Sequence, residues 1–120
     1  MGADIHPFLE VKVCGKWRFI PLSLQSDRDY ELFGMLSGVR GEGPPFARVL
    51  KDLEKDASEE VRQAWDGGEW GHTPTIVSCE DIEAILHEKS DAYVRGWLQV
   101  MEDMMKLGVE DVRVILWYDS

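Results

Sequence analysis

The stretch DVRVILWY, residues 111–118, decides the fold, because it is the strongest β-strand pattern in the chain. β-Branched and aromatic residues dominate it, and they fall on both faces of a strand whose side chains alternate. Strands that are apolar on both faces are typical of the interior of a sheet that is covered on both sides. We therefore expect residues 111–118 to form an inner strand.

The N-terminal segment predicts the strands beside it. Residues 4–13 alternate well enough to form a strand, although Pro7 indicates an edge position or an irregular start. Gly15-Lys16 predicts a tight turn, and residues 17–22 return as the second strand of a hairpin.

Helical patterns fill most of the space between the hairpin and the last strand. Helices are expected over residues 27–37, 58–65, 79–87 and 91–107, and residues 46–57 also show helical spacing. Residues 75–77 resemble a brief strand, and long loops are expected at 38–46 and 66–74. The order predicts a single α+β domain over residues 1–120, in which a small antiparallel sheet of the N-terminal hairpin plus the C-terminal strand is covered by several helices.

The charge of the chain limits its partners. The formal net charge is −10, from 23 acidic and 13 basic residues. This balance argues against direct nucleic-acid binding and against anionic membrane surfaces, and no apolar run approaches the length of a membrane span. It permits a basic protein partner. Cys14 and Cys79 lack CxxC spacing and are expected to be reduced, as in a cytoplasmic protein.

Seven residues form a candidate ligand site. Asp4 and His6 share one face of the first strand, while Arg28 lies in the first turn of a helix, where free N–H groups favour anions. Trp70 lies in a glycine-rich loop that can close over a planar ring. The full set is Asp4, His6, Arg28, Tyr30, Arg40, Trp70 and His72.

Other roles for these residues stay open. Asp4, His6 and His72, joined by Asp66 or Asp119, could hold a divalent metal ion, although no HExxH or other recognised ligand spacing is present. Alternatively, Asp4 and His6 are ordinary hydrogen-bonded residues of a sheet. Arg28 and Arg40 could likewise be paired with acidic neighbours, namely Asp27, Asp29, Glu31 and Glu42. Trp65 is expected to be a core anchor.

Four short motifs resemble a family of small bacteriophage and prophage proteins of unassigned function. They are MGADIH (1–6), DRDYELF (27–33), HTPT (72–75) and VRVILWYD (112–119). Members of that family open with MGCDIH and carry an H-S-x-S block where this chain has Pro74 and two threonines. The resemblance implies a phage genome as the setting and does not imply a reaction.

These features together predict a function. We expect a phage accessory protein that counters host defence by binding a small signalling nucleotide without catalysis, in the cytoplasm of the host. One alternative is an acidic, anti-CRISPR-like inhibitor that imitates nucleic acid, and another is a small metal-dependent phosphoesterase. No cofactor is expected apart from that possible metal ion. The five tryptophans and five methionines favour a homo-oligomer.

Overall fold

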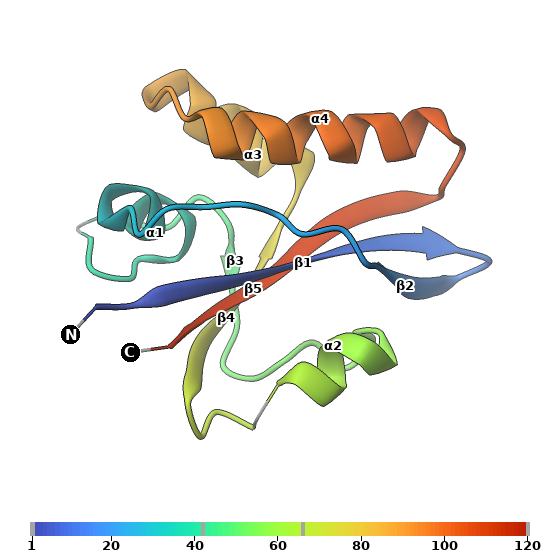
Figure 1. Cartoon of the computed structure of the whole chain (residues 1–120), viewed down its shortest axis with the longest axis horizontal. Helices are drawn as coiled ribbons and strands as arrows, with labels where there is room; N and C mark the ends of the chain where they lie inside the picture. The colour runs from blue at the N-terminus through green and yellow to red at the C-terminus, as the bar shows by residue number, and fades with distance from the viewer. Residues whose placement is uncertain (1, 42, 66, 120) are drawn as a thin grey trace.

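One antiparallel sheet organises the chain (Figure 1). The computed structural model describes residues 2–41, 43–65 and 67–119. In chain order the elements are β1 (Asp4–Val13), β2 (Lys16–Ile20), α1 (Tyr30–Ser37), β3 (Arg48–Val49), α2 (Glu59–Ala64), β4 (Gly71–Val77), α3 (Cys79–Glu88), α4 (Ala92–Lys106) and β5 (Asp111–Asp119). The strand order is β2-β1-β5-β4-β3, so the predicted α+β class is confirmed.

β5 is the middle strand, as its apolar pattern predicts. It pairs with β1 from Asp4↔Asp119 to Lys12↔Asp111, and with β4 on its other side. Val114 packs in the larger core with α1, α3 and α4, whereas Ile115 packs in a smaller core beneath α2. Figure 1 shows α3 and α4 on one side of the sheet and α2 on the other. Both faces of β5 are therefore buried.

The hairpin turn lies one residue earlier than the sequence suggests. Cys14 and Gly15 form it, with φ angles of 51° and 76°, and Val13 faces Lys16 across it. Two consecutive positive φ angles are typical of the type I′ turn that joins two-residue hairpins. Pro7 lies where β1 pairs with β5 but not with β2, so its missing N–H costs no hydrogen bond to β2.

One predicted helix begins too early, and one segment with helical spacing is not a helix. α1 begins at Tyr30, because Asp29 is the N-cap and its carboxylate accepts a hydrogen bond from Leu32 N at 3.1 Å. Residues 46–57 contain no helix, since Ala47 N bonds to α1 and the following two residues pair with β4 as β3. The three remaining helices are confirmed, and their N-caps are Ser58, Ser78 and Asp91.

β4 is longer than the expected strand at residues 75–77. It begins at Gly71, so His72 belongs to a strand rather than to a loop. A bulge between His72 and Thr75 interrupts its pairing with β5, and Thr73 in that bulge has a φ of 59°. The bulge and Pro74 hide the regular alternation by which a strand is recognised.

A buried ion pair anchors α2 to the sheet. Glu10 is fully buried, and its carboxylate accepts hydrogen bonds from Arg113 Nε at 2.8 Å and from Ser58 N at 2.7 Å. Arg113 also donates to Asp56 at 2.9 Å and lies 3.9 Å from the centre of the Trp17 ring. Ser58 is the N-cap of α2, so this network fixes where that helix begins.

We predict that Val114→Asp unfolds the protein. Val114 is completely buried in β5, and an unpaired charge at such a position costs several kcal/mol, roughly the stability of a small domain. Val13→Asp is the matched control, because Val13 is 37% exposed at the end of β1. Circular dichroism during thermal unfolding is the measurement. A folded Val114→Asp protein with the Tm of the control would contradict the inner position of β5.

Candidate functional site

The sheet register brings the candidate residues to one end of the sheet. Asp4, Asp119 and Gly71 face one another across β1, β5 and β4. The next residues along the strands, Ile5, Tyr118 and His72, are also paired across β1, β5 and β4, and their side chains lie on the opposite face of the sheet. The described ends of the chain lie side by side at this end (Figure 1). Residues from distant parts of the sequence therefore meet here.

Arg28 is paired with Asp4. Its Nε donates to Asp4 Oδ1 at 2.9 Å, so its partner is 24 residues away and is none of the acidic neighbours considered from the sequence. This hydrogen bond lowers the pKa of Asp4 below its ordinary value and raises the pKa of Arg28. Both side chains are about half exposed, so the pair contributes little to stability.

Tyr30 and Arg40 lie next to this pair. The Tyr30 hydroxyl accepts a hydrogen bond from Ala3 N at 3.2 Å, and the Arg40 guanidinium lies 4.9 Å from the centre of the Tyr30 ring. Arg40 has a φ of 58°, a conformation that non-glycine residues rarely adopt. Glu42, an expected partner of Arg40, lies outside the described residues.

Gly2 explains part of the MGADIH motif. A Cβ atom at this position would lie 2.5 Å from Arg28 Nη1 and 2.6 Å from the Tyr30 hydroxyl oxygen. Only glycine lets the chain pass so close to these two side chains without displacing them.

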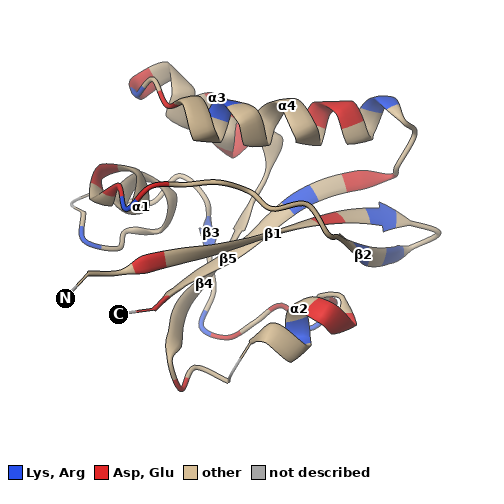
Figure 2. Ribbon diagram, in the orientation of Figure 1, with Lys and Arg blue, Asp and Glu red and all other residues tan. Residues whose placement is uncertain are grey.

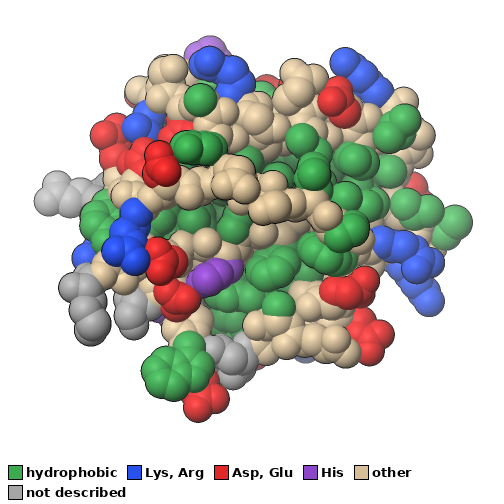
Figure 3. Space-filling view, viewed as in Figure 1, with side chains coloured by type: hydrophobic (Ala, Val, Ile, Leu, Met, Phe, Trp, Pro, Cys, Tyr) green, Lys and Arg blue, Asp and Glu red, His purple; other side chains and the backbone are tan. Residues whose placement is uncertain are grey.

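His6 forms a second group with Asp119. Its Nε2 hydrogen-bonds to Asp119 Oδ2 at 2.6 Å, and the two side chains are 40% and 42% exposed. They line a hollow of about 320 Å³ with Phe8, Ala64, Trp70, Gly71 and Trp117. Phe8 stacks on Trp117 at 4.8 Å between ring centres, so one wall is aromatic. On the face shown in Figure 3, a histidine lies between acidic side chains and a group of hydrophobic ones.

His72 lies on the other face of the sheet. Its ring stacks on Tyr118 at 6.1 Å between centres, and its Nδ1 hydrogen-bonds with Thr73 Oγ1 at 2.8 Å. The Tyr118 hydroxyl is buried and hydrogen-bonds with Ser37, which in turn bonds with Thr75. Burial raises the pKa of Tyr118 above its ordinary range. The sheet therefore separates His72 from His6.

This placement bears on the metal-site hypothesis. Asp4, His6 and His72 are not brought together, and Asp119 bonds to His6. Within residues 2–41, 43–65 and 67–119, no three His, Cys, Asp or Glu side chains are placed to share an ion. Asp66, another expected ligand, lies outside the described residues.

Sequence reasoning missed some residues of this region. The alternation of strand residues could have predicted Phe8, since Phe8 shares a face with Asp4 and His6. The place of Trp117 at the hollow could not be predicted without the register of β1 and β5. Trp65 is an anchor, as expected. Its ring packs edge-on against Trp117 at 5.1 Å, and its Nε1 donates to Asp52 at 3.2 Å.

We predict that Arg28→Ala raises the pKa of Asp4 toward its ordinary value, measured by carboxyl-carbon NMR titration. Because this pKa is lowered in the folded state, the contribution of the pair is present above the unfolded pKa and disappears as the pH falls through the folded pKa. Arg95→Ala, an exposed arginine on α4, is the control and leaves Asp4 unchanged. Equal pKa values for Asp4 in the wild type and in Arg28→Ala would refute the pairing.

No family model, no curated protein sequence and no solved structure shows a significant match to the chain.

Proposed function

We propose that the protein binds a small nucleotide-like ligand, without transforming it, at the end of the sheet where β1, β5 and β4 meet. One observation carries the proposal: His6 and Asp119 line the aromatic hollow, and the neighbouring Asp4 is paired with Arg28. Arg40 lies nearby, against the ring of Tyr30. Aromatic walls with a few convergent polar groups are typical of small-ligand sites.

The charge at this end suits an anionic ligand better than the net charge of the whole chain does. Arg28 and Arg40 offset Asp4 and Asp119, so the region is neutral before its histidines are counted, whereas the chain carries −10. Arg40 contacts the ring of Tyr30, and guanidinium groups bind phosphate through paired hydrogen bonds. The strained backbone at Arg40 fits this interpretation, since strain gathers at functional sites.

The resemblance to phage proteins supplies the biological setting of the proposal. A phage protein that sequesters a signalling nucleotide in the host cytoplasm removes the messenger on which a defence system depends. No helix within the described ranges is long and apolar enough to cross a membrane.

The two alternatives find less support in the geometry. A nucleic-acid mimic needs carboxylates arrayed like phosphates, whereas Figure 2 shows acidic residues scattered over several helices and strand ends and mixed with basic ones. A metal-dependent phosphoesterase needs Asp4, His6 and His72 close together. His72, however, lies on the opposite face of the sheet from Asp4 and His6.

We predict that one or more of the cyclic mono-, di- and trinucleotides binds the protein in calorimetric titration and raises its Tm. Arg40→Ala should weaken that binding about 10- to 100-fold, through loss of a charge-assisted hydrogen bond. Arg95→Ala has the same charge change on α4 and should bind like the wild type. If none of these nucleotides binds, or if Arg40→Ala and Arg95→Ala bind equally well, the proposed site is wrong. Hydrolysis of the nucleotide would favour the phosphoesterase.

We also propose self-association through the end of α4. Trp97 and Met101 face the core, but Met105 is 43% exposed and Leu107 is 78% exposed. Light scattering at tens of micromolar should give twice the monomer mass of 13.7 kDa, and Leu107→Lys should restore the monomer. Val49→Lys, at a 38% exposed site on β3, is the control. A monomer mass for the wild-type protein would reject the dimer.

A further inference from the structure

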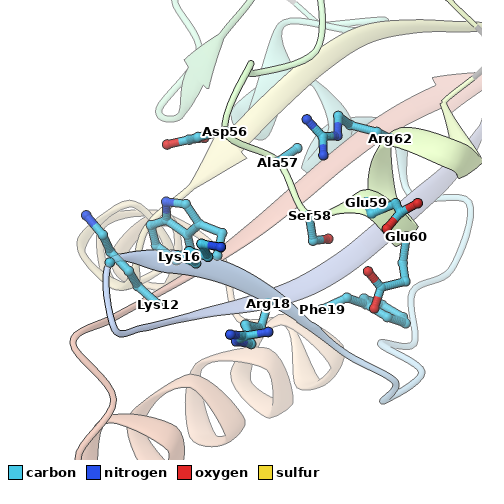
Figure 4. A pocket seen from close by; sticks show the side chains of 12 residues that line it. Lys12, Lys16, Arg18, Phe19, Asp56, Ala57, Ser58, Glu59, Glu60 and Arg62 are labelled. Atoms are coloured by element: carbon cyan, nitrogen blue, oxygen red, sulfur yellow. The ribbon is translucent and has the colours of Figure 1, made fainter.

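A larger hollow lies at the opposite end of the β1–β5 pair. It has a volume of about 600 Å³ and opens between the β1–β2 hairpin and α2 with the residues that precede it (Figure 4). The candidate site above shares none of its lining residues. Its volume lies within the range of about 300–1,000 Å³ that is typical of small-molecule sites.

Four cationic side chains line this hollow: Lys12, Lys16, Arg18 and Arg62. None of the four has a carboxylate of the described chain within 4.0 Å, in contrast to Arg28, Arg48, Lys89 and Arg113. Figure 4 shows Arg62 reaching from α2 past Ala57, with Lys12 on the hairpin across the gap. Cations from two separate elements therefore border one space.

The acidic residues of the hollow form no ion pair with its cations within the described chain. Asp56 is held by Arg113, and Glu59 and Glu60 are the other two acids of the lining. With Arg18 at the rim, the three remaining cations and the three acids leave the hollow neutral, on a chain whose net charge is −10. Cations that are free of carboxylate partners in a neutral hollow favour a small anion, but the surrounding negative charge repels an extended polyanion such as nucleic acid.

The floor of the hollow is rigid. The Trp17 ring lies against Arg113, whose guanidinium is fixed by the fully buried Glu10. Glu10 also accepts a hydrogen bond from Ser58 N, so the same carboxylate joins the hairpin wall to the start of α2. A site whose walls are held before the ligand arrives loses less entropy on binding.

We propose that this hollow is a second binding site, for a small polyanion such as an oligophosphate or a polycarboxylate. Lys12, Lys16 and Arg62 supply the positive charge, and Trp17 and Phe19 form the apolar side. Arg18 lies at the rim, since it projects past the β2 strand in Figure 4. The proposal is independent of the nucleotide site, because the two lie at opposite ends of the sheet.

The test is an amide NMR titration of the full chain with tripolyphosphate and, separately, with citrate, at low ionic strength. We expect saturable shifts confined to residues 12–19 and 56–62. The double variant Lys16→Ala/Arg62→Ala should weaken binding at least about tenfold, because each lysine or arginine offers a charge-assisted contact. Both residues are exposed and hold no ion pair within the described chain, so the fold should persist.

A second double variant, Arg95→Ala/Lys106→Ala, removes the same charge from α4 and should bind like the wild type. The stronger of the two probes identifies phosphate or carboxylate as the preferred group, and equal binding also supports a polyanion site. Shifts that do not saturate, equal weakening in both double variants, or shifts centred on Asp4 and Arg40 would each overturn the proposal. Failure of the nucleotide proposal would leave these shifts unchanged.

Discussion

The burial of β5 on both faces is the constraint on which the rest of the structure depends. A strand with Val114 and Leu116 on one side and Ile115 and Trp117 on the other must have a sheet neighbour at each edge and a layer over each face. The N-terminal hairpin and β4 provide the neighbours. α1, α3 and α4 cover one face, and α2 covers the other. Among the described residues, the buried charged side chains are Glu10 and Arg113, and they are paired with each other, because a lone buried ion would cost several kcal/mol.

The pairing of β1 with β5 along its whole length also determines where polar side chains lie. Antiparallel pairing from Asp4↔Asp119 to Lys12↔Asp111 sets the two ends of the chain side by side at one end of the sheet and the hairpin turn at the other. Polar side chains lie at both ends of the sheet, because its interior is apolar. The terminal end has a hydrogen-bonded His6–Asp119 pair and an Arg28–Asp4 pair, whereas the hairpin end has cations that lack a carboxylate partner among the described residues.

Sequence patterns could predict much of this arrangement, since they depend on local chemistry. The alternation of residues 4–13, the apolar run at 111–118 and the caps at Ser58, Ser78 and Asp91 each report a structure that forms nearby in the chain. β3 and the first half of β4 escaped prediction because partner strands specify them. Arg48 and Val49 become a strand only by pairing with Ile76 and Thr75, and a bulge disrupts the alternation after His72.

The candidate site shows the same limit in its details. Alternation alone places Asp4, His6 and Phe8 on one face, and this is what the register shows. The partners of these residues, however, come from distant sequence: Asp119 for His6, Arg28 for Asp4 and Trp117 for Phe8. His72 was expected beside His6, but the longer β4 sets it on the opposite face, where it stacks on Tyr118. A one-residue difference in strand phase thus decides which histidine faces the aromatic hollow, because neighbouring residues of a strand point to opposite faces.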